Sequence, residues 1–200
     1  MKVDILALGA HPDDVEMSCS GTLLAAVAAG KKIAIVDFTR GELGTRGTPE
    51  IRAAESAIVL CNAVNDRHPD HGRGSQLATE ACFLSGLRMI ETLGHNGQPQ
   101  AAWRPKYVYH YIQDRQIPAD FVVDITPYWA GKWASINAYG TQFFNTNADP
   151  AAPQTYLSGQ TFSHFMEARA REFGHLIGVE FGEGFTVERT LGVKELGDLI

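Results

Sequence analysis

Short apolar runs alternate with amphipathic stretches along the chain. The runs at residues 3–9 and 32–38 are mostly apolar, as strands buried inside a parallel sheet usually are. Between them, residues 21–29 are rich in leucine and alanine and stop at Gly30, a residue that often ends helices. This order of strand, helix and strand predicts a right-handed βαβ unit with two parallel strands.

The alternation continues toward the end of the chain, interrupted by a glycine-rich loop at residues 40–48 and a polar loop at residues 145–153. Further helices are predicted at residues 49–57, 72–92, 127–144 and about 159–177. Further strands are predicted at residues 58–64, 106–112 and 120–124, with a final strand or hairpin at 179–191. The sequence therefore predicts an α/β fold: a single Rossmann-like domain with a mainly parallel twisted sheet flanked by helices.

One junction between predicted elements lacks a turn signal. The helix predicted up to Ala57 runs straight into the strand that begins at Ile58, without Gly, Pro or Asn between them. Connections from a helix to a strand normally need a few loop residues. We therefore interpret residues 1–200 as one domain from which a segment is missing between residues 57 and 58.

Composition and charge exclude several classes of function. The formal net charge is -6 and no run of Lys or Arg is present, so we expect neither nucleic acid nor a membrane surface as a partner. We find no secretory signal, no apolar run long enough to span a bilayer, and only three scattered cysteines, too few for a disulfide framework. The expected protein is cytoplasmic and acts on a small molecule.

Two clusters of histidine and aspartate each follow a predicted strand. The first is Ala-His-Pro-Asp-Asp-Val-Glu at residues 10–16, and the second is Asp-Arg-His-Pro-Asp-His at residues 66–71. Open α/β sheets bind ligands at the carboxyl ends of their strands. Because parallel strands end at the same edge, we expect both clusters to line one crevice.

These side chains are the types that a catalytic metal site requires. His11, Asp14 and His71 offer two imidazoles and one carboxylate, and catalytic zinc uses three such protein ligands plus an open position. Iron(II) fits the same nitrogen and oxygen ligands. Asp13 is placed to take the proton of an attacking water, and His68 to stabilise an oxyanion and protonate a leaving amine. The set predicts metal-assisted hydrolysis of an amide.

A structural interpretation competes with this catalytic one. An Asp-Asp pair such as Asp13–Asp14 more often serves as a helix N-cap than as a catalytic pair, and a histidine beside proline is commonly a surface residue. The recurrence of His-Pro-Asp after two strands favours the catalytic interpretation. In it, Asp70 hydrogen-bonds His68, fixes its tautomer and raises its pKa.

The chain resembles a known family, the PIG-L/LmbE-like zinc-dependent N-acetylglucosaminyl deacetylases. The similar segments are the two clusters, residues 41–52, and, with the bacillithiol-biosynthesis branch, residues 120–126, 132–143 and 167–185. The resemblance implies that His11, Asp14 and His71 bind zinc, that Asp13 is the general base, and that His68 is the general acid oriented by Asp70. The arginines it implies in substrate binding are Arg52 and, less directly, Arg67 and Arg104. Arg46, like Arg52 and Arg67, lies near the clusters in sequence, where such a residue either binds a polar substrate or pairs with an acid.

The resemblance also implies a substrate and an assembly state. Such enzymes remove the N-acetyl group from a GlcNAc conjugate, and the expected substrate is N-acetylglucosaminyl malate, the bacillithiol precursor. Members are often homo-oligomers, and they carry a further strand and helix at the position of the junction at residues 57 and 58. Two alternatives stay open: a deacetylase of another N-acetylated sugar or antibiotic intermediate, and a non-catalytic carbohydrate-binding module if that segment is truly absent.

Overall fold

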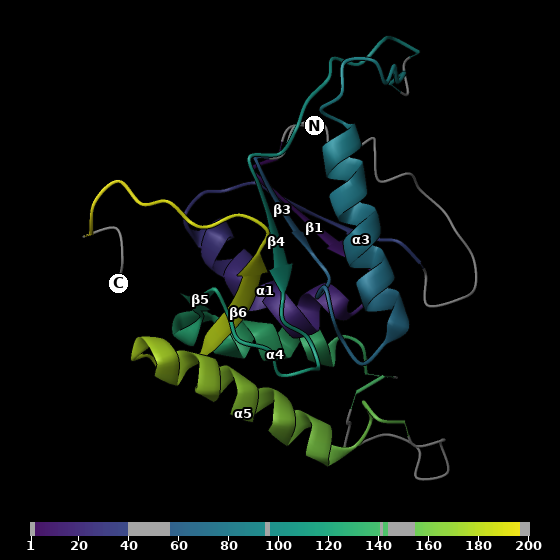
Figure 1. Cartoon of the computed structure of the whole chain (residues 1–200). Coiled ribbons are helices and arrows are strands. Elements are labelled where there is room, and N and C mark those ends of the chain that lie inside the picture. Colours follow the sequence, from purple (N-terminus) through teal and green to yellow (C-terminus); the bar gives the residue numbers. More distant parts are fainter. Residues whose placement is uncertain (1–2, 40–56, 95–96, 141, 144–154, 197–200) are drawn as a thin grey trace.

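The computed structural model of the chain describes residues 3–39, 57–94, 97–140, 142–143 and 155–196 (Figure 1). Its strands are β1 (Ile5–Gly9), β2 (Ile33–Asp37), β3 (Ile58–Cys61), β4 (Tyr107–Tyr111), β5 (Phe121–Asp124) and β6 (Gly182–Val187). Its helices are α1 (Asp14–Ala28), α3 (Pro69–Leu84), the short 3-10 helix η1 (Thr126–Tyr128), α4 (Trp129–Asn137) and α5 (Gln160–Ile177).

The strands form one six-stranded sheet in the order β2-β1-β3-β4-β6-β5. The first four strands of this order are parallel, and Ile5 of β1 pairs with Ile33 of β2 on one side and Ile58 of β3 on the other. Strand β6 is antiparallel to both of its neighbours, β4 and β5. The predicted α/β class with a mainly parallel sheet is confirmed, and the predicted terminal strand or hairpin is a single strand.

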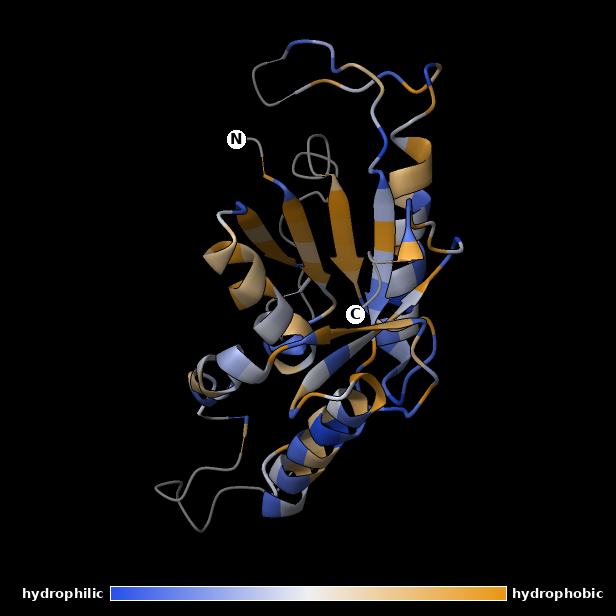
Figure 2. Cartoon of the chain, turned by 90° about the vertical axis from the view of Figure 1, so that its left-hand side faces the viewer, coloured by the Kyte–Doolittle hydropathy of each residue, from blue (hydrophilic) through white to orange (hydrophobic). Residues whose placement is uncertain are grey.

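Helices cover both faces of the sheet (Figure 1). Helix α3 contacts β1, β3 and β4, whereas α1 packs with α4 and α5 packs against β5 and β6. Strands β1, β2 and β3 are strongly hydrophobic, whereas β4 is mostly hydrophilic and α5 carries alternating hydrophobic and hydrophilic residues (Figure 2). This pattern follows from burial, since inner parallel strands are covered on both faces and α5 exposes one side to water.

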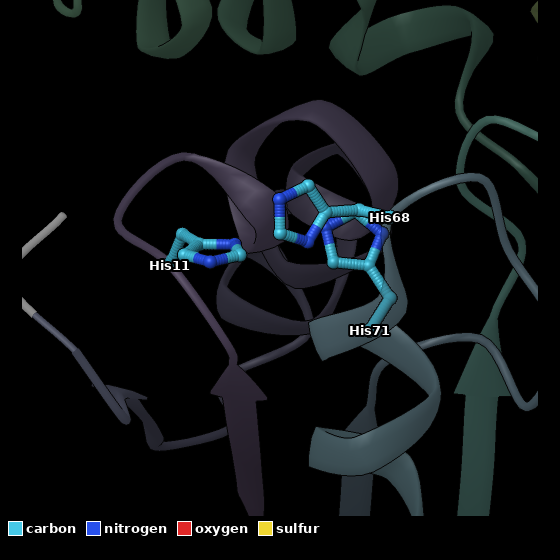
Figure 3. A group of neighbouring side chains, drawn as sticks. All are labelled: His11, His68 and His71. Carbon is cyan, nitrogen blue, oxygen red and sulfur yellow. The ribbon is translucent and has the colours of Figure 1, made fainter. Parts of the chain in front are cut away.

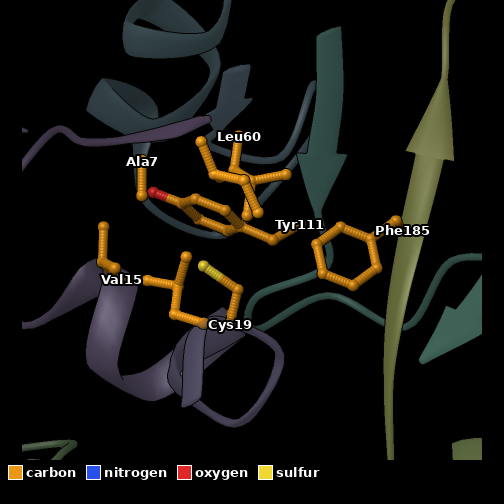
Figure 4. Close-up of a cluster of buried hydrophobic side chains, with 8 residues drawn as sticks. Ala7, Val15, Cys19, Leu60, Tyr111 and Phe185 are labelled. Carbon is orange, nitrogen blue, oxygen red and sulfur yellow. The ribbon is translucent and has the colours of Figure 1, made fainter. Parts of the chain in front are cut away.

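Successive residues of β1 feed two separate cores. Ala7 packs with Tyr111 and Phe185 on the side of α1, while Leu6 and Leu8 pack on the side of α3. The Tyr111 ring fills the space between α1 and the sheet (Figure 4), and its hydroxyl donates a hydrogen bond to the backbone oxygen of Leu8 at 2.7 Å. The three cysteines are buried free thiols within these layers.

Several boundaries differ from the predicted ones. Helix α1 begins at Asp14 rather than at Gly21, and α3 ends at Leu84 rather than at residue 92. Ser18, Ser20 and Gly21 are weak helix formers but are buried inside α1, so tertiary packing overrides their propensity. A Cβ at Gly21 would lie 2.8 Å from Ile125 Cβ, so only glycine permits this approach. The predicted loops at 40–48 and 145–153, and the helix at 49–57 apart from Ala57, lie outside the described residues.

The sheet constrains what could be missing near residue 57. Strands β2 and β3 flank β1 on its two sides, so a further strand would have to join at the outer edge of β2 or β5. The missing segment itself stays a prediction. Among the described helices, none is long and apolar enough to cross a membrane.

Candidate metal centre and active site

The first cluster forms a tight turn between β1 and α1. A Cβ at Gly9 would come within 2.9 Å of the backbone oxygen of His11 and 3.0 Å of an Asp37 carboxylate oxygen, so this approach requires glycine. Asp13 stands at the N-cap position of α1 with φ of 108°, a left-handed conformation that costs a residue with a side chain about 1–3 kcal/mol. Such strain at a turn that carries ligating side chains is typical of a functional site.

The second cluster forms the start of α3 and faces the first. His68 is the N-cap residue of α3, with Pro69 in the first turn, and His71 follows within the same turn. The rings of His11, His68 and His71 converge (Figure 3), and one nitrogen of each lies within 4.8 Å of the others. The two sequence clusters therefore meet at one edge of the sheet, as predicted.

The Asp14 carboxylate lies between two of these rings. Its Oδ1 is 3.1 Å from His71 Nε2, and its Oδ2 is 3.6 Å from His11 Nδ1. Burial alone would raise the pKa of the Asp14 carboxyl, but hydrogen bonds with His11 and His71 hold it well below its usual range. The hydrogen bond with Asp14 raises the pKa of His11. Hydrogen bonds with Asp14 and Asp66 raise the pKa of His71 to about 9 despite its burial.

This geometry fits a divalent ion. Ligand atoms at about 2.0–2.2 Å in a tetrahedral arrangement lie about 3.4 Å from one another. The spacings from Asp14 to His71 and to His11, 3.1 and 3.6 Å, lie on either side of that value. Two imidazole nitrogens and one carboxylate oxygen are also the donor types that zinc and iron(II) accept.

Three further side chains hold the ligands in place, and sequence reasoning gave none of them a role. Asp66 accepts a hydrogen bond from His71 Nδ1 and, through its other oxygen, from the backbone N–H groups of residues 114 and 115. Asn62 and Gln113 donate to the two oxygens of Asp14 at 2.9 and 3.0 Å. A carboxylate on the far nitrogen of a ligating histidine fixes its tautomer. Asp66 is the first aspartate of the second cluster, and its place in that motif was the sequence signal for this supporting role.

Asp13 is free for chemistry even though it occupies a capping position. Within the described residues its side chain makes no capping hydrogen bond, and it lines the same cavity as the histidines. Burial and the neighbouring Asp14 raise the pKa of the Asp13 carboxyl to about 7. Asp13 therefore occupies the N-cap position of α1, as the structural interpretation expected, but its side chain does not act as a cap.

The structure corrects the expected partnership of His68 and Asp70. The Asp70 carboxylate is exposed, pairs with Arg73 at 3.0 Å, and stays 3.9 Å from His68 Nδ1. The ring nitrogen instead accepts the backbone N–H of Asp70 at 3.3 Å. Burial and the neighbouring histidines His11 and His71 lower the pKa of His68, opposite to the predicted direction.

That backbone hydrogen bond also distinguishes the role of His68 from those of the ligands. Because Nδ1 accepts, the neutral ring carries its proton on Nε2. A ligating nitrogen must present a lone pair, so a protonated Nε2 suits a proton donor better than a metal ligand. In His71 the order is reversed, since Nδ1 donates to Asp66 and Nε2 faces Asp14.

One cavity of about 590 Å³, a usual size for a small-molecule site, is lined by His11, Asp13, Asp14, His68 and His71. Arg67 lines it, forming an ion pair with Asp114 at 3.1 Å and lying 4.3 Å from the centre of the Tyr156 ring. Arg169, which sequence reasoning did not single out, also lines it. The signal for Arg169 was a charged residue on the apolar face of the helix predicted at 159–177.

Arg104, which the resemblance placed in substrate binding, lies away from the histidines. Its guanidinium lies over the Phe83 ring and donates to the Phe83 backbone oxygen at 2.7 Å. It precedes β4, so it lies at the amino ends of the parallel strands, the sheet edge opposite the histidines. Arg46 and Arg52 lie outside the described residues.

Sequence comparison connects the first cluster to a family. Residues 6–63 match the sequence model of PIG-L, described as GlcNAc-PI de-N-acetylase, and the match ends before the second cluster. A segment of 43 residues is 49% identical to the uncharacterized deacetylase YaiS of Escherichia coli (strain K12), covering 22% of this chain and 23% of that protein. These matches support a PIG-L-family deacetylase and do not reach the bacillithiol branch.

Solved structures resemble the chain over nearly its full length. The conserved protein TT1542 from Thermus thermophilus is 25% identical with a TM-score of 0.76, over 97% of this chain and 98% of that one. The N,N'-diacetylchitobiose deacetylase from Pyrococcus horikoshii has a TM-score of 0.69 at 19% identity, over 98% and 88%. GalB, the 4-carboxy-2-hydroxymuconate hydratase from Pseudomonas putida KT2440, has a TM-score of 0.62 at 16% identity, over 98% and 100%. The fold therefore occurs in enzymes of different activity.

Proposed function

We propose that the chain is a metal-dependent hydrolase that removes the N-acetyl group from a GlcNAc conjugate. The observation that carries this proposal is the convergence of His11, Asp14 and His71 in one cavity with Asp13 and His68. The match of residues 6–63 to PIG-L and the local identity with an E. coli deacetylase support the same reaction. The fold alone does not, because a hydratase shares it.

Zinc is the proposed ion, held by His11, Asp14 and His71, and iron(II) fits the same donors. When bound, such an ion supplies Lewis acidity to the acetyl carbonyl and acidity to a water molecule. The hydrogen bonds from Asn62 and Gln113 keep Asp14 turned toward the two rings, so the ligands are preorganised.

The proton transfers fall to the two remaining groups. Asp13 faces the cavity with a carboxylate that makes no capping hydrogen bond in the described chain, and it accepts the proton of the attacking water. His68 donates from Nε2, first as a hydrogen bond to the acetyl oxygen as negative charge develops there. It then passes this proton to the leaving amine nitrogen while the proton that Asp13 took from the water replaces it on the ring. Acetate and the free amino sugar are released, and both side chains return to their starting protonation states.

For the substrate we propose N-acetylglucosaminyl malate, with another N-acetylated sugar or an antibiotic intermediate as the alternative. A non-catalytic carbohydrate-binding module is the remaining possibility if the segment between residues 57 and 58 is truly absent. We further propose that the chain works in the cytoplasm as a homo-oligomer.

The test combines metal analysis with release of a primary amine from GlcNAc conjugates. We expect the purified protein to carry stoichiometric zinc or iron, and chelation to abolish amine release. His71→Ala is expected to lose metal and activity together, whereas the control His175→Ala, at an exposed position of α5, keeps both. A metal-loaded protein that releases no amine from any N-acetyl sugar contradicts the proposal, and turnover of a hydroxymuconate would point to a hydratase instead.

A further inference from the structure

A buried arginine faces the active-site cavity without an acidic partner. The Arg169 side chain, on α5, is only 7% exposed, and its Nη1 has no hydrogen-bond partner in the described part of the chain. Its Nη2 contacts the Met166 sulfur at 3.2 Å, its guanidinium carbon lies 5.2 Å from the centre of the Phe165 ring, and it makes no ion pair with a described carboxylate. An unpaired buried charge is costly. Such a group persists when something outside the chain completes it.

The acids whose charges act most on Arg169 already have other partners. They are Asp114, Asp66 and Glu183. Asp114 pairs with Arg67 and Glu183 with Lys132, whereas Asp66 accepts hydrogen bonds from His71 and from two backbone N–H groups. None of the three forms an ion pair with Arg169 in the described part of the chain.

A second unpartnered group lines the same cavity as Arg169. The Ser18 hydroxyl is buried and has no hydrogen-bond partner among the described residues. Ser18 and Arg169 also line a second, smaller cavity together. One turn of α1 separates Ser18 from Asp14, which places Ser18 about 6 Å along the helix axis from that carboxylate.

We propose that Arg169 and Ser18 form a subsite for an anionic group, a carboxylate or a phosphate, on the part of the substrate that is linked to the sugar. A planar guanidinium binds two oxygens of such a group side by side, and the serine hydroxyl donates a further hydrogen bond. This subsite rests on the proposed deacetylation and narrows it to anionic GlcNAc conjugates.

The experiment compares three substrates that differ only in the group at the anomeric position. They are the methyl glycoside of GlcNAc, which is neutral, its carboxymethyl glycoside, and GlcNAc 1-phosphate. Hydrogen bonds to charged groups contribute about 1.5–3 kcal/mol, so KM for an anionic substrate is expected to be roughly 10–150-fold below that of the neutral one. A preference for the carboxymethyl glycoside or for the phosphate identifies the anion.

Variants assign the preference to the subsite. Arg169→Gln is expected to raise KM for the anionic substrate to near that for the neutral one, Arg169→Lys to restore part of the preference, and Ser18→Ala to reduce it several-fold. The matched control is Arg171→Gln on the same helix, where the guanidinium is exposed and pairs with Glu167 and Glu180. This control keeps the wild-type preference.

Thermal unfolding of Arg169→Met separates binding from a structural role. Removing an unpaired buried charge in favour of an apolar side chain of similar length is expected to raise Tm of the ligand-free protein. A lower Tm, or a failure of the Arg169 variants to fold, shows that Arg169 supports the fold and overturns the proposal. A wild-type protein without preference for either anion overturns it as well.

Direct binding keeps this result distinct from that of the proposed function. The same three glycosides are titrated calorimetrically, with turnover followed separately. Tighter binding of an anionic glycoside that is lost in Arg169→Gln, without amine release, supports the subsite and contradicts deacetylation. Equal amine release from all three glycosides supports deacetylation and contradicts the subsite.

Discussion

Two buried polar regions of this domain treat their charged groups in opposite ways. Between α1, α4 and β6, Lys132 and Glu183 pair at 2.6 Å, and Glu183 also accepts hydrogen bonds from the backbone N–H groups of Gly21 and Thr22 and from the Thr22 hydroxyl. In the cavity, Arg169 and Ser18 are buried to a similar degree, and Arg169 Nη1 and the Ser18 hydroxyl have no hydrogen-bond partner among the described residues. Both regions are buried to a similar degree, so burial does not explain why one is paired and the other is not. We attribute the difference to their roles: one supports the fold, and the other is the proposed binding site.

The unpartnered groups are also concentrated at one place. The described buried side chains with an unpartnered polar atom are Glu16, Ser18, Asp37, Asn62 and Arg169. They lie at or beside the carboxyl ends of β1, β2 and β3, or line the cavity that opens there. Native structures leave few buried polar groups unsatisfied. The Lys132–Glu183 pair is satisfied within the described chain, whereas these unpartnered atoms lie at or near the proposed site, where a bound ligand would complete Arg169 and Ser18.

The largest effect is expected from removing the base. Asp13→Asn keeps the size of the side chain, and no capping hydrogen bond of Asp13 is lost in the described structure, so stability should change little. The loss of proton transfer is expected to lower kcat about 10²–10⁴-fold. Amine release and Tm are measured together, with Asp4→Asn as the control, at an exposed position just before β1 where the asparagine oxygen can still accept the backbone N–H of Lys32. A variant that retains both metal and near-normal kcat contradicts the role of Asp13.

Removing one partner of the Lys132–Glu183 pair is expected to lower stability, whereas Arg169→Met in the cavity is expected to raise it. Glu183→Ala leaves Lys132 as an uncompensated buried charge and should lower the free energy of unfolding by about 3–5 kcal/mol. The double variant Glu183→Leu with Lys132→Met should recover much of that loss. Urea denaturation measures both. If Glu183→Ala is as stable as the double variant, leaving Lys132 unpaired carries no cost, and the pair does not stabilise the fold.

The sequence predicted the order of the elements and the meeting of the two clusters, because both depend on local patterns. Apolar runs and the His-Pro-Asp motif are visible in the chain, and the rule that parallel strands end at one edge brings residues 10–16 and 66–71 together. The start of α1 was predicted too late because Ser18 and Gly21 look unfavourable until their buried neighbours are known.

The supporting contacts of the site could not be predicted because they depend on distances across the fold. Asp66 and Asp70 are both acidic residues beside histidines, and only the structure shows that Asp66 bonds His71 while Asp70 turns to Arg73. Arg104 was assigned to the site by resemblance, yet its strand begins at the opposite edge. Arg169 is distant in sequence from both clusters, and its lack of a partner is a three-dimensional property.

An intermediate effect is expected at the carboxylate behind His71. Asp66→Asn removes the negative acceptor that fixes the tautomer of His71, and loss of such a partner typically lowers metal affinity about 10–100-fold. The same change at Asp70, which is exposed, pairs with Arg73 at 3.0 Å and lies 3.5 Å from His11 Nε2, should have a smaller effect because water screens its charge. Competition with a chromogenic chelator measures both affinities. Equal losses in the two variants would contradict this difference between the two aspartates.

The smallest effect is expected from relieving the strain in the turn. Asp13 has φ of 108°, which glycine adopts without the penalty of about 1–2 kcal/mol that a side chain brings, although glycine loses about 0.5–1 kcal/mol of backbone entropy. Asp13→Gly should therefore raise the free energy of unfolding by up to about 1 kcal/mol while abolishing amine release. Ala25→Gly, within the same helix, measures the entropy cost alone and should lower stability by about 0.5–1 kcal/mol. If Asp13→Gly is destabilised as much as Ala25→Gly, the left-handed turn stores no strain. The backbone of Asp13 would then cost the fold nothing, and in this respect Asp13 would resemble Lys132 and Glu183 rather than the unpartnered Arg169.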